Sequence, residues 1–177
     1  MEENIYSCNL DAETGAKLNL YLYKEVKNLK ELREKVMNGS LKCCIIKPSL
    51  VCSPFQVSVA ANKALLSAKR GTLTTRTIFS EVLFNLSLSK NITQSLIKFG
   101  IDDKETNLLV AIIEQNGEDT SEILGNVDGE QCSIDELEKF SDTKLIEKTY
   151  KVQNCKQISQ LTDLVVSKIV TKDFVSH

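Results

Sequence analysis

Side chains that could carry out chemistry are sparse in this chain of 177 residues. The only histidine, His177, is the last residue, and a serine or cysteine nucleophile normally needs a base beside it. The adjacent carboxylates Asp102 and Asp103 are more typical of a helix end or a turn than of a catalytic pair. The glycine motifs that cradle phosphate, Gly-x-x-x-x-Gly-Lys and Gly-x-Gly-x-x-Gly, do not occur. The sequence therefore predicts a protein that binds, not an enzyme.

The six cysteines follow no metal or disulfide pattern. None belongs to a Cys-x-x-Cys motif, and Cys43, Cys44 and Cys52 lack the spacing of a tetrahedral zinc site, so we expect no metal and no cofactor. The chain opens Met-Glu-Glu-Asn, without the basic and apolar regions of a signal peptide, which favours reduced thiols in a cytosolic protein. The longest apolar runs, such as residues 108–113, are too short to span a membrane.

Charge is unevenly distributed, although the formal net charge is only −2. Residues 1–101 carry a net charge of +6, residues 102–147 carry −11, and residues 148–177 carry +3. Between residues 56 and 80 there are four basic groups and no acidic one. This distribution indicates a dipolar surface, and the alternative is two ordinary solvated faces of opposite sign.

Hydrophobic periodicity predicts a small sheet and many helices. Apolar and polar residues alternate over 17–26, which is typical of a half-buried strand, and short apolar runs at 43–46 and 108–113 predict buried strands. Ser53 and Pro54 predict a helix start, because serine caps and proline at the first position gives up no needed N–H. That helix should run to about residue 69 and stop at Gly71. The other predicted helices lie between Asn28 and Gly39, at 77–87, from Asn91 to Gly100, from the capping box Ser133-Ile-Asp-Glu136, at 142–150 and at 156–170.

These elements predict one mixed α/β (α+β) domain over residues 1–177. Its small β-sheet should pack against several helices, and the order of the elements is not the regular alternation of a doubly wound fold. The three consecutive helices between residues 54 and 100 have short connections, so we expect them to pack as neighbours.

Several sequence motifs form a recognisable set. They are the run 54–66 (Pro-Phe-Gln-Val-Ser-Val-Ala-Ala-Asn-Lys-Ala-Leu-Leu), Thr74-Thr-Arg-Thr77, Ser80-Glu-Val-Leu-Phe-Asn-Leu-Ser87, Asn91-Ile92, Lys98-Phe-Gly-Ile101 and Ser167-Lys-Ile-Val-Thr-Lys-Asp173. Together these motifs resemble the PRPK-binding protein (TPRKB) family, the small non-catalytic subunit of the EKC/KEOPS complex. The resemblance covers nearly the whole chain and is most specific over residues 54–101.

The resemblance implies a mixed α/β domain without enzymatic activity of its own. It implies binding to the small atypical kinase/ATPase subunit (PRPK-like), an indirect association with the threonylcarbamoyl-transferase subunit, and a cytoplasmic and nuclear protein. It further implies support for threonylcarbamoyladenosine modification of tRNA at position 37, with a role in binding the tRNA 3′ end. One alternative is a generic cytosolic interaction domain that docks a kinase without touching RNA, and another is a small enzyme with a cryptic thiol site.

Two sets of residues are candidates for these contacts. In the helix at 77–87, apolar residues form more than one stripe, so Phe79, Leu83 and Leu86 are candidates for a hydrophobic kinase interface. The alternative is a helix sandwiched in the core. The four basic residues of 56–80 are candidates for tRNA phosphate contacts, with ordinary solvated side chains as the alternative. They are Lys63, Lys69, Arg70 and Arg76.

Overall fold

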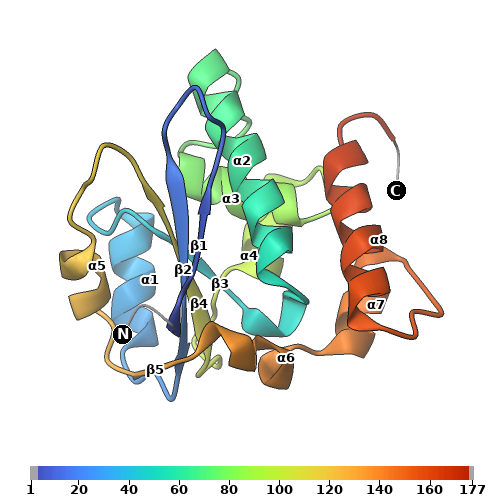
Figure 1. Cartoon of the computed structure of the whole chain (residues 1–177). Helices are drawn as coiled ribbons and strands as arrows, with labels where there is room; N and C mark the ends of the chain where they lie inside the picture. Colours follow the sequence, from blue (N-terminus) through green and yellow to red (C-terminus); the bar gives the residue numbers. More distant parts are fainter. Residues whose placement is uncertain (1–3, 176–177) are drawn as a thin grey trace.

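The computed structural model describes residues 4–175, which form an antiparallel sheet with helices on both faces (Figure 1). The sheet order is β1-β2-β4-β3, and β5 pairs with β2 on the same edge as β1. The mixed α+β fold predicted from the sequence is therefore confirmed. The strands are β1 (Tyr6–Asn9), β2 (Lys17–Lys24), β3 (Cys44–Ile46), β4 (Leu108–Glu114) and β5 (Glu130–Cys132).

The two long strands β2 and β4 form the centre of the sheet. They run antiparallel, with Leu20 opposite Ala111 and Leu22 opposite Leu109. Residues 108–112 are at most 2% exposed, so β4 is covered on both faces, as its unbroken apolar run predicted.

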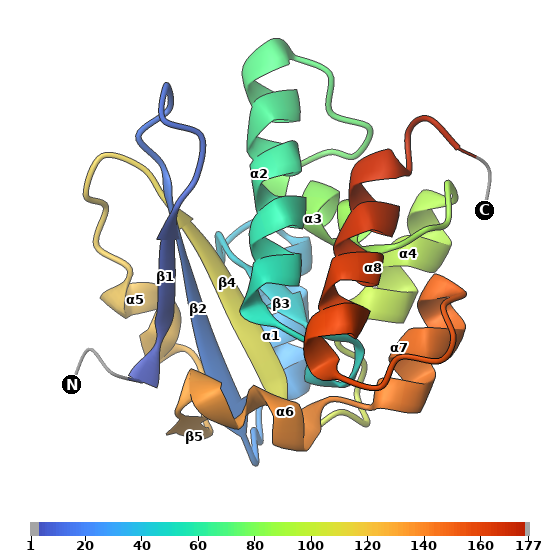
Figure 2. The same ribbon diagram turned by 45° about the vertical axis from the view of Figure 1, so that its right-hand side comes forward.

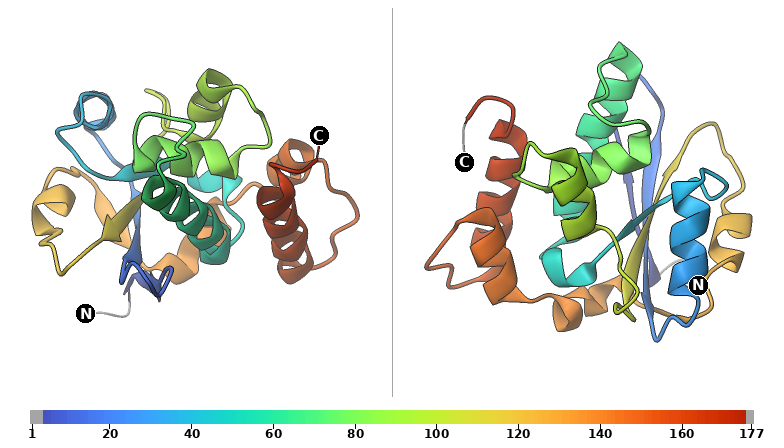
Figure 3. Two further views of the ribbon diagram at one scale, coloured as in Figure 1. Left: turned by 90° about the horizontal axis from the view of Figure 1, so that it is seen from above. Right: turned by 180° about the vertical axis from the view of Figure 1, so that it is seen from behind.

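Helices lie on both faces of the sheet, so the fold has three layers: helices, sheet and helices (Figures 2 and 3). The face with Tyr21 and Tyr23 packs against α1. The opposite face, with Leu18, Leu20 and Leu22, packs against α2 and α3, and α8 lies against α2. The helices are α1 (Leu29–Met37), α2 (Pro54–Arg70), α3 (Ile78–Leu86), α4 (Ile92–Phe99), α5 (Ser121–Gly125), α6 (Leu137–Phe140), α7 (Thr143–Tyr150) and α8 (Ile158–Thr171), with 3₁₀ turns η2 (Pro48–Leu50) and η3 (Ile134–Glu136).

Helix α2 is the longest helix of the described chain, and its ends follow the sequence signals. The Ser53 hydroxyl accepts a hydrogen bond from the Phe55 N–H, and Pro54 occupies the first helical position. Gly71 ends the helix at φ +68°, a left-handed conformation that glycine adopts without strain. The small residues Ala60 and Ala64 are fully buried, which lets neighbouring elements approach α2 closely.

A few short elements differ from the sequence expectation. Strands β1 and β5 and helix α5 were not predicted, because each has five residues or fewer and little apolar periodicity. The predicted capping box at Ser133 and Glu136 does not form. The Ser133 hydroxyl accepts from the Asp135 N–H, and the segment opens as a 3₁₀ turn before α6. None of the helices within residues 4–175 is long and apolar enough to cross a membrane.

Candidate functional site

The described residues contain no group of three or more His, Cys, Asp or Glu side chains that could hold a metal ion. All six cysteines are free thiols. Burial raises the pKa of Cys43 to about 12, and the pKa of Cys44 is raised well above its ordinary value for the same reason. A buried thiol that resists ionisation is a poor nucleophile. His177 lies outside the described residues.

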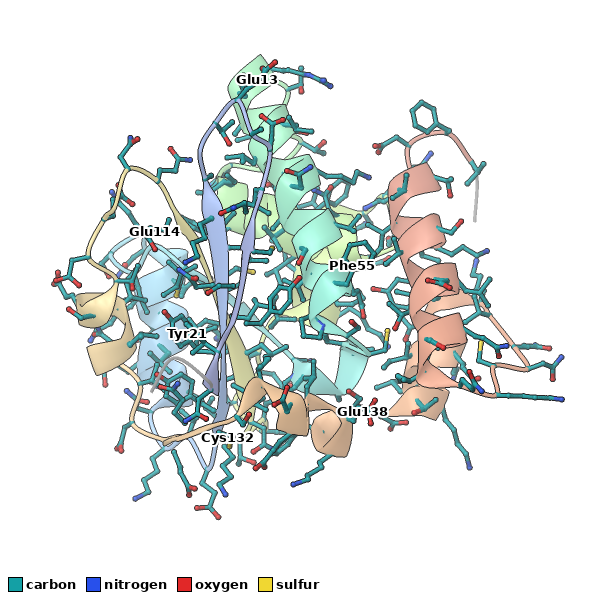
Figure 4. All side chains as sticks on the ribbon, in the orientation of Figure 1. Glu13, Tyr21, Phe55, Glu114, Cys132 and Glu138 are labelled. Atoms are coloured by element: carbon teal, nitrogen blue, oxygen red, sulfur yellow. The ribbon has the colours of Figure 1, made fainter. Side chains whose placement is uncertain are left out.

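A groove of about 470 Å³ lies between the start of α2, the segment η3–α6 and the start of α8. Its lining carries three carboxylates and no lysine or arginine. One of them, Glu138, belongs to α6 and is labelled in Figure 4. An acidic groove of this kind does not attract a phosphate group. The carboxylates are Asp135, Glu138 and Asp163.

The four basic candidates do not form one patch. Lys63 reaches across to α8, where its ammonium donates to the Ile169 carbonyl at 2.9 Å and lies 3.3 Å from Asp173. Lys69 points the other way, to the loop between β1 and β2, where it pairs with Glu13 and lies 3.9 Å from Asp11. Figure 4 places Glu13 at the tip of that loop, beside the last turn of α2. Lys63 and Lys69 therefore hold neighbouring elements to opposite sides of α2.

Arg70 and Arg76 are different, because both are exposed and neither forms an ion pair within residues 4–175. Arg70 ends α2, and Arg76 lies in the loop that leads into α3. Two of the four basic candidates thus have guanidinium groups free to meet a phosphate. The half-exposed Phe55 is no stacking partner for them, since it lies at the far end of α2, about 22 Å from Arg70 along the helix axis.

The three apolar candidates on α3 are more buried than an interface requires. Leu86 is 0% exposed and belongs to the core, so it offers no exposed anchor on this surface. The Tyr150 hydroxyl donates to the Leu86 carbonyl at 2.6 Å, which fixes this end of α3 from α7. Phe79 and Leu83 are partly buried and pack against the same core. The alternative of a helix sandwiched in the core describes Leu86 correctly, because α3 is covered from several sides.

The large apolar side chains that are exposed lie elsewhere. Val170 is 48% exposed at the end of α8, and Phe174 and Val175 just beyond it are 85% and 41% exposed. We call these three residues the C-terminal apolar surface. The sequence carries a signal for Val170 alone. The buried stripe of α8 runs through Leu161, Val165 and Ile169, and Val170 lies beside that stripe.

The C-terminal apolar surface is attached to α3 through a buried lysine. Lys172 is 1% exposed, its ammonium donates to the Phe84 carbonyl, and it lies 3.4 Å from the centre of the Phe84 ring. The carbonyls of the last turn of a helix lack intrahelical partners and carry partial negative charge, so a cation there caps the helix. Lys172 therefore fastens the end of α8 to the end of α3.

The described residues thus present exposed apolar and basic surfaces and no assembled catalytic group. The family model "Kinase binding protein CGI-121" matches residues 23–173, and the chain belongs to this family. The resemblance drawn from the sequence motifs is thereby confirmed.

Curated relatives cover most of the chain and of their own length. The EKC/KEOPS complex subunit TPRKB of Danio rerio is 38% identical over 156 residues, which is 86% of this chain and 89% of that protein. The EKC/KEOPS complex subunit CGI121 of Kluyveromyces lactis is 34% identical over 132 residues, 73% of this chain and 83% of that protein. The CGI121 subunit of Yarrowia lipolytica is 31% identical over 132 residues, 73% and 76% of the two chains.

Proposed function

We propose that this chain is a non-catalytic subunit of an EKC/KEOPS complex. In this role it binds the small atypical kinase/ATPase subunit and is linked through it to the threonylcarbamoyl-transferase subunit. It supports threonylcarbamoyladenosine modification of tRNA at position 37 by helping to bind the tRNA 3′ end, in the cytoplasm and the nucleus. The family and the names of the relatives support the kinase-binding part of this proposal.

The observation that carries the kinase-binding part is the C-terminal apolar surface. Val170 lies in the last turn of α8 and Phe174 in the turn that follows, and both are large exposed apolar side chains beside Lys172, which is fixed to α3. Exposed apolar side chains held on a rigid element are typical of binding anchors, because their burial supplies most of an interface's free energy. Phe79 and Leu83 remain a second candidate for the same interface, being only partly buried on α3.

Co-purification with the kinase subunit tests this assignment. We expect the double variant Val170→Glu with Phe174→Glu to lose the kinase while its circular dichroism stays native. Met37→Glu is the matched control, since Met37 is 79% exposed and lies at the end of α1, on the opposite face of the sheet. If the double variant retains the kinase and a folded Leu83→Glu variant loses it, the kinase interface lies on α3 instead.

The proposed tRNA contact depends on Arg70 and Arg76, the two unpaired cations of the four candidates. The acid-free stretch 56–80 surrounds them, whereas residues 102–147 carry a net charge of −11 and should repel a phosphate backbone. The overall charge of −2 predicts weak binding by the isolated chain, which tethering within the complex would strengthen.

A salt series separates RNA contact from kinase docking alone. In the reconstituted complex we expect Arg70→Glu with Arg76→Glu to weaken tRNA binding and to flatten the slope of log affinity against log salt by about two phosphate contacts. Kinase co-purification should be unchanged. Equal affinity and equal slope in wild type and variant would leave a subunit that docks the kinase with no direct RNA contact.

A further inference from the structure

Glu81 is a buried carboxylate whose charge acts on the buried Lys172 ammonium. It is 2% exposed, it lies in the first turn of α3, and none of the ion pairs within residues 4–175 includes it. Burying a charge is costly unless hydrogen bonds and dipoles replace the lost water. The positive end of the α3 dipole supplies part of this stabilisation.

The loop before α3 contributes three hydrogen bonds to the Glu81 carboxylate. The Thr75 N–H donates to Glu81 at 2.8 Å and the Thr75 hydroxyl donates to the same oxygen at 2.7 Å. The Thr74 N–H donates to the other carboxylate oxygen at 3.2 Å. Hydrogen bonds to an ionised acceptor are stronger than those between neutral groups. Glu81 therefore fixes the backbone at Thr74 and Thr75.

A second set of contacts fixes the other end of the loop. The Thr77 hydroxyl accepts from the Ser80 N–H at 3.1 Å, and the Ser80 hydroxyl accepts from the Thr77 N–H at 3.1 Å, which forms a reciprocal capping box. The residue between the fixed positions Thr75 and Thr77 is Arg76. Its backbone is held from both sides, and its side chain is exposed.

We propose that Glu81 is a positioning residue that presents Arg76 to a phosphate group of tRNA. The inference rests on the proposed RNA contact and adds the group that organises it. A loop held in its binding conformation loses less conformational entropy when it binds, and functional loops are positioned by rigid elements in this way. The two N–H groups and the hydroxyl that donate to Glu81 offset part of its negative charge.

The direction in which tRNA affinity changes when Glu81 is removed distinguishes a positioning role from simple charge repulsion. Removing an acidic charge normally strengthens binding to a phosphate backbone, since one repulsion is lost. If Glu81 positions Arg76, then Glu81→Ala weakens tRNA binding instead. The exposed Glu118 is the charge-matched control, and Glu118→Ala should not weaken binding.

The experiment has two arms on the full chain. In the first, hydrogen exchange followed by NMR measures the amides of Thr74 and Thr75. We expect protection in the wild type, its loss in Glu81→Ala while the core strand β4 stays protected, and an intermediate value in Glu81→Gln, which keeps an acceptor oxygen. Unprotected amides in the wild type, or equal protection in a folded Glu81→Ala, would overturn the proposal. If Glu81→Ala does not fold, Glu81→Gln alone decides this arm.

The second arm measures the affinity for a tRNA transcript in the reconstituted complex at low salt. We expect Arg76→Ala and Glu81→Ala each to weaken binding by about threefold, the size of one phosphate contact. The double variant should be no weaker than Arg76→Ala alone, because Glu81 acts through Arg76. Additive losses, or no loss from Glu81→Ala, would overturn the positioning role, whereas no loss from Arg76→Ala would overturn the proposed RNA contact itself.

Discussion

The buried Lys172 makes the stability of this protein depend on pH in a way that can be isolated. Burial lowers the pKa of Lys172 from its ordinary 10.5 to about 8, and the neighbouring Lys63 adds to this effect. Asp173 and Glu81 act in the opposite direction, and Lys90 acts in the same direction as Lys63. Below pH 8 the folded protein therefore holds an ammonium ion that water would solvate better.

The direction of this pH dependence follows from the number of protons that the folded and unfolded states bind at Lys172. Between pH 8 and pH 10.5 the folded state binds fewer protons at Lys172 than the unfolded state does, so this contribution to the free energy of unfolding rises with pH. Each pH unit within that window adds about 1.4 kcal/mol to the free energy of unfolding. From pH 7 to pH 9.5 we therefore expect a gain of about 2 kcal/mol from this lysine.

The assay is urea unfolding of wild type and Lys172→Met at a series of pH values. Methionine keeps an apolar side chain on Phe84 and cannot titrate, so the other titrating groups cancel in the difference between the two proteins. The stability of the wild type relative to the variant should rise between pH 7 and pH 9.5. A difference between wild type and Lys172→Met that stays flat with pH would refute the buried-ammonium reasoning.

Substitutions at three further positions should each lower the free energy of unfolding, measured by urea titration at neutral pH. Tyr150→Phe removes the donor to the Leu86 carbonyl and the acceptor for the Gln56 amide at 2.9 Å, and should cost about 1–3 kcal/mol; an unchanged stability would contradict that network. Leu86→Ala should cost about 2–5 kcal/mol through the cavity it leaves, and a loss below about 0.5 kcal/mol would show that Leu86 is not core. Ser53→Ala removes the cap of α2 and should cost about 1 kcal/mol, while Ser53→Gly should cost only a few tenths.

The sequence predicts the longer elements well, because their periodicity reports which face is buried. The run at 108–113, the stripe of α8 and the caps at Ser53 and Asn91 all appear where local chemistry places them. The short edge strands could not be found in this way. Strand β5 has the sequence Glu-Gln-Cys and exists because it pairs with β2, about a hundred residues earlier in the chain.

The candidate site shows the same division between local and long-range information. Sequence reasoning identifies Lys63 and Lys69 as basic, but their acidic partners come from the distant β1–β2 loop and the end of the chain. It also identifies α3 as apolar on more than one stripe, which does not say what covers each stripe. Leu86 is buried in the core, so its assignment to an exposed kinase interface was wrong.

In the proposed function helix α3 supports both contact surfaces, although its own apolar residues are largely buried. At its first turn Glu81 holds the loop that carries Arg76, and at its last turn the Phe84 carbonyl holds Lys172 and with it the end of α8. The proposed RNA contact and the C-terminal apolar surface are therefore fixed to opposite ends of one helix. Because Leu86 and Val82 anchor this helix in the core, it holds the two surfaces at a fixed position relative to each other.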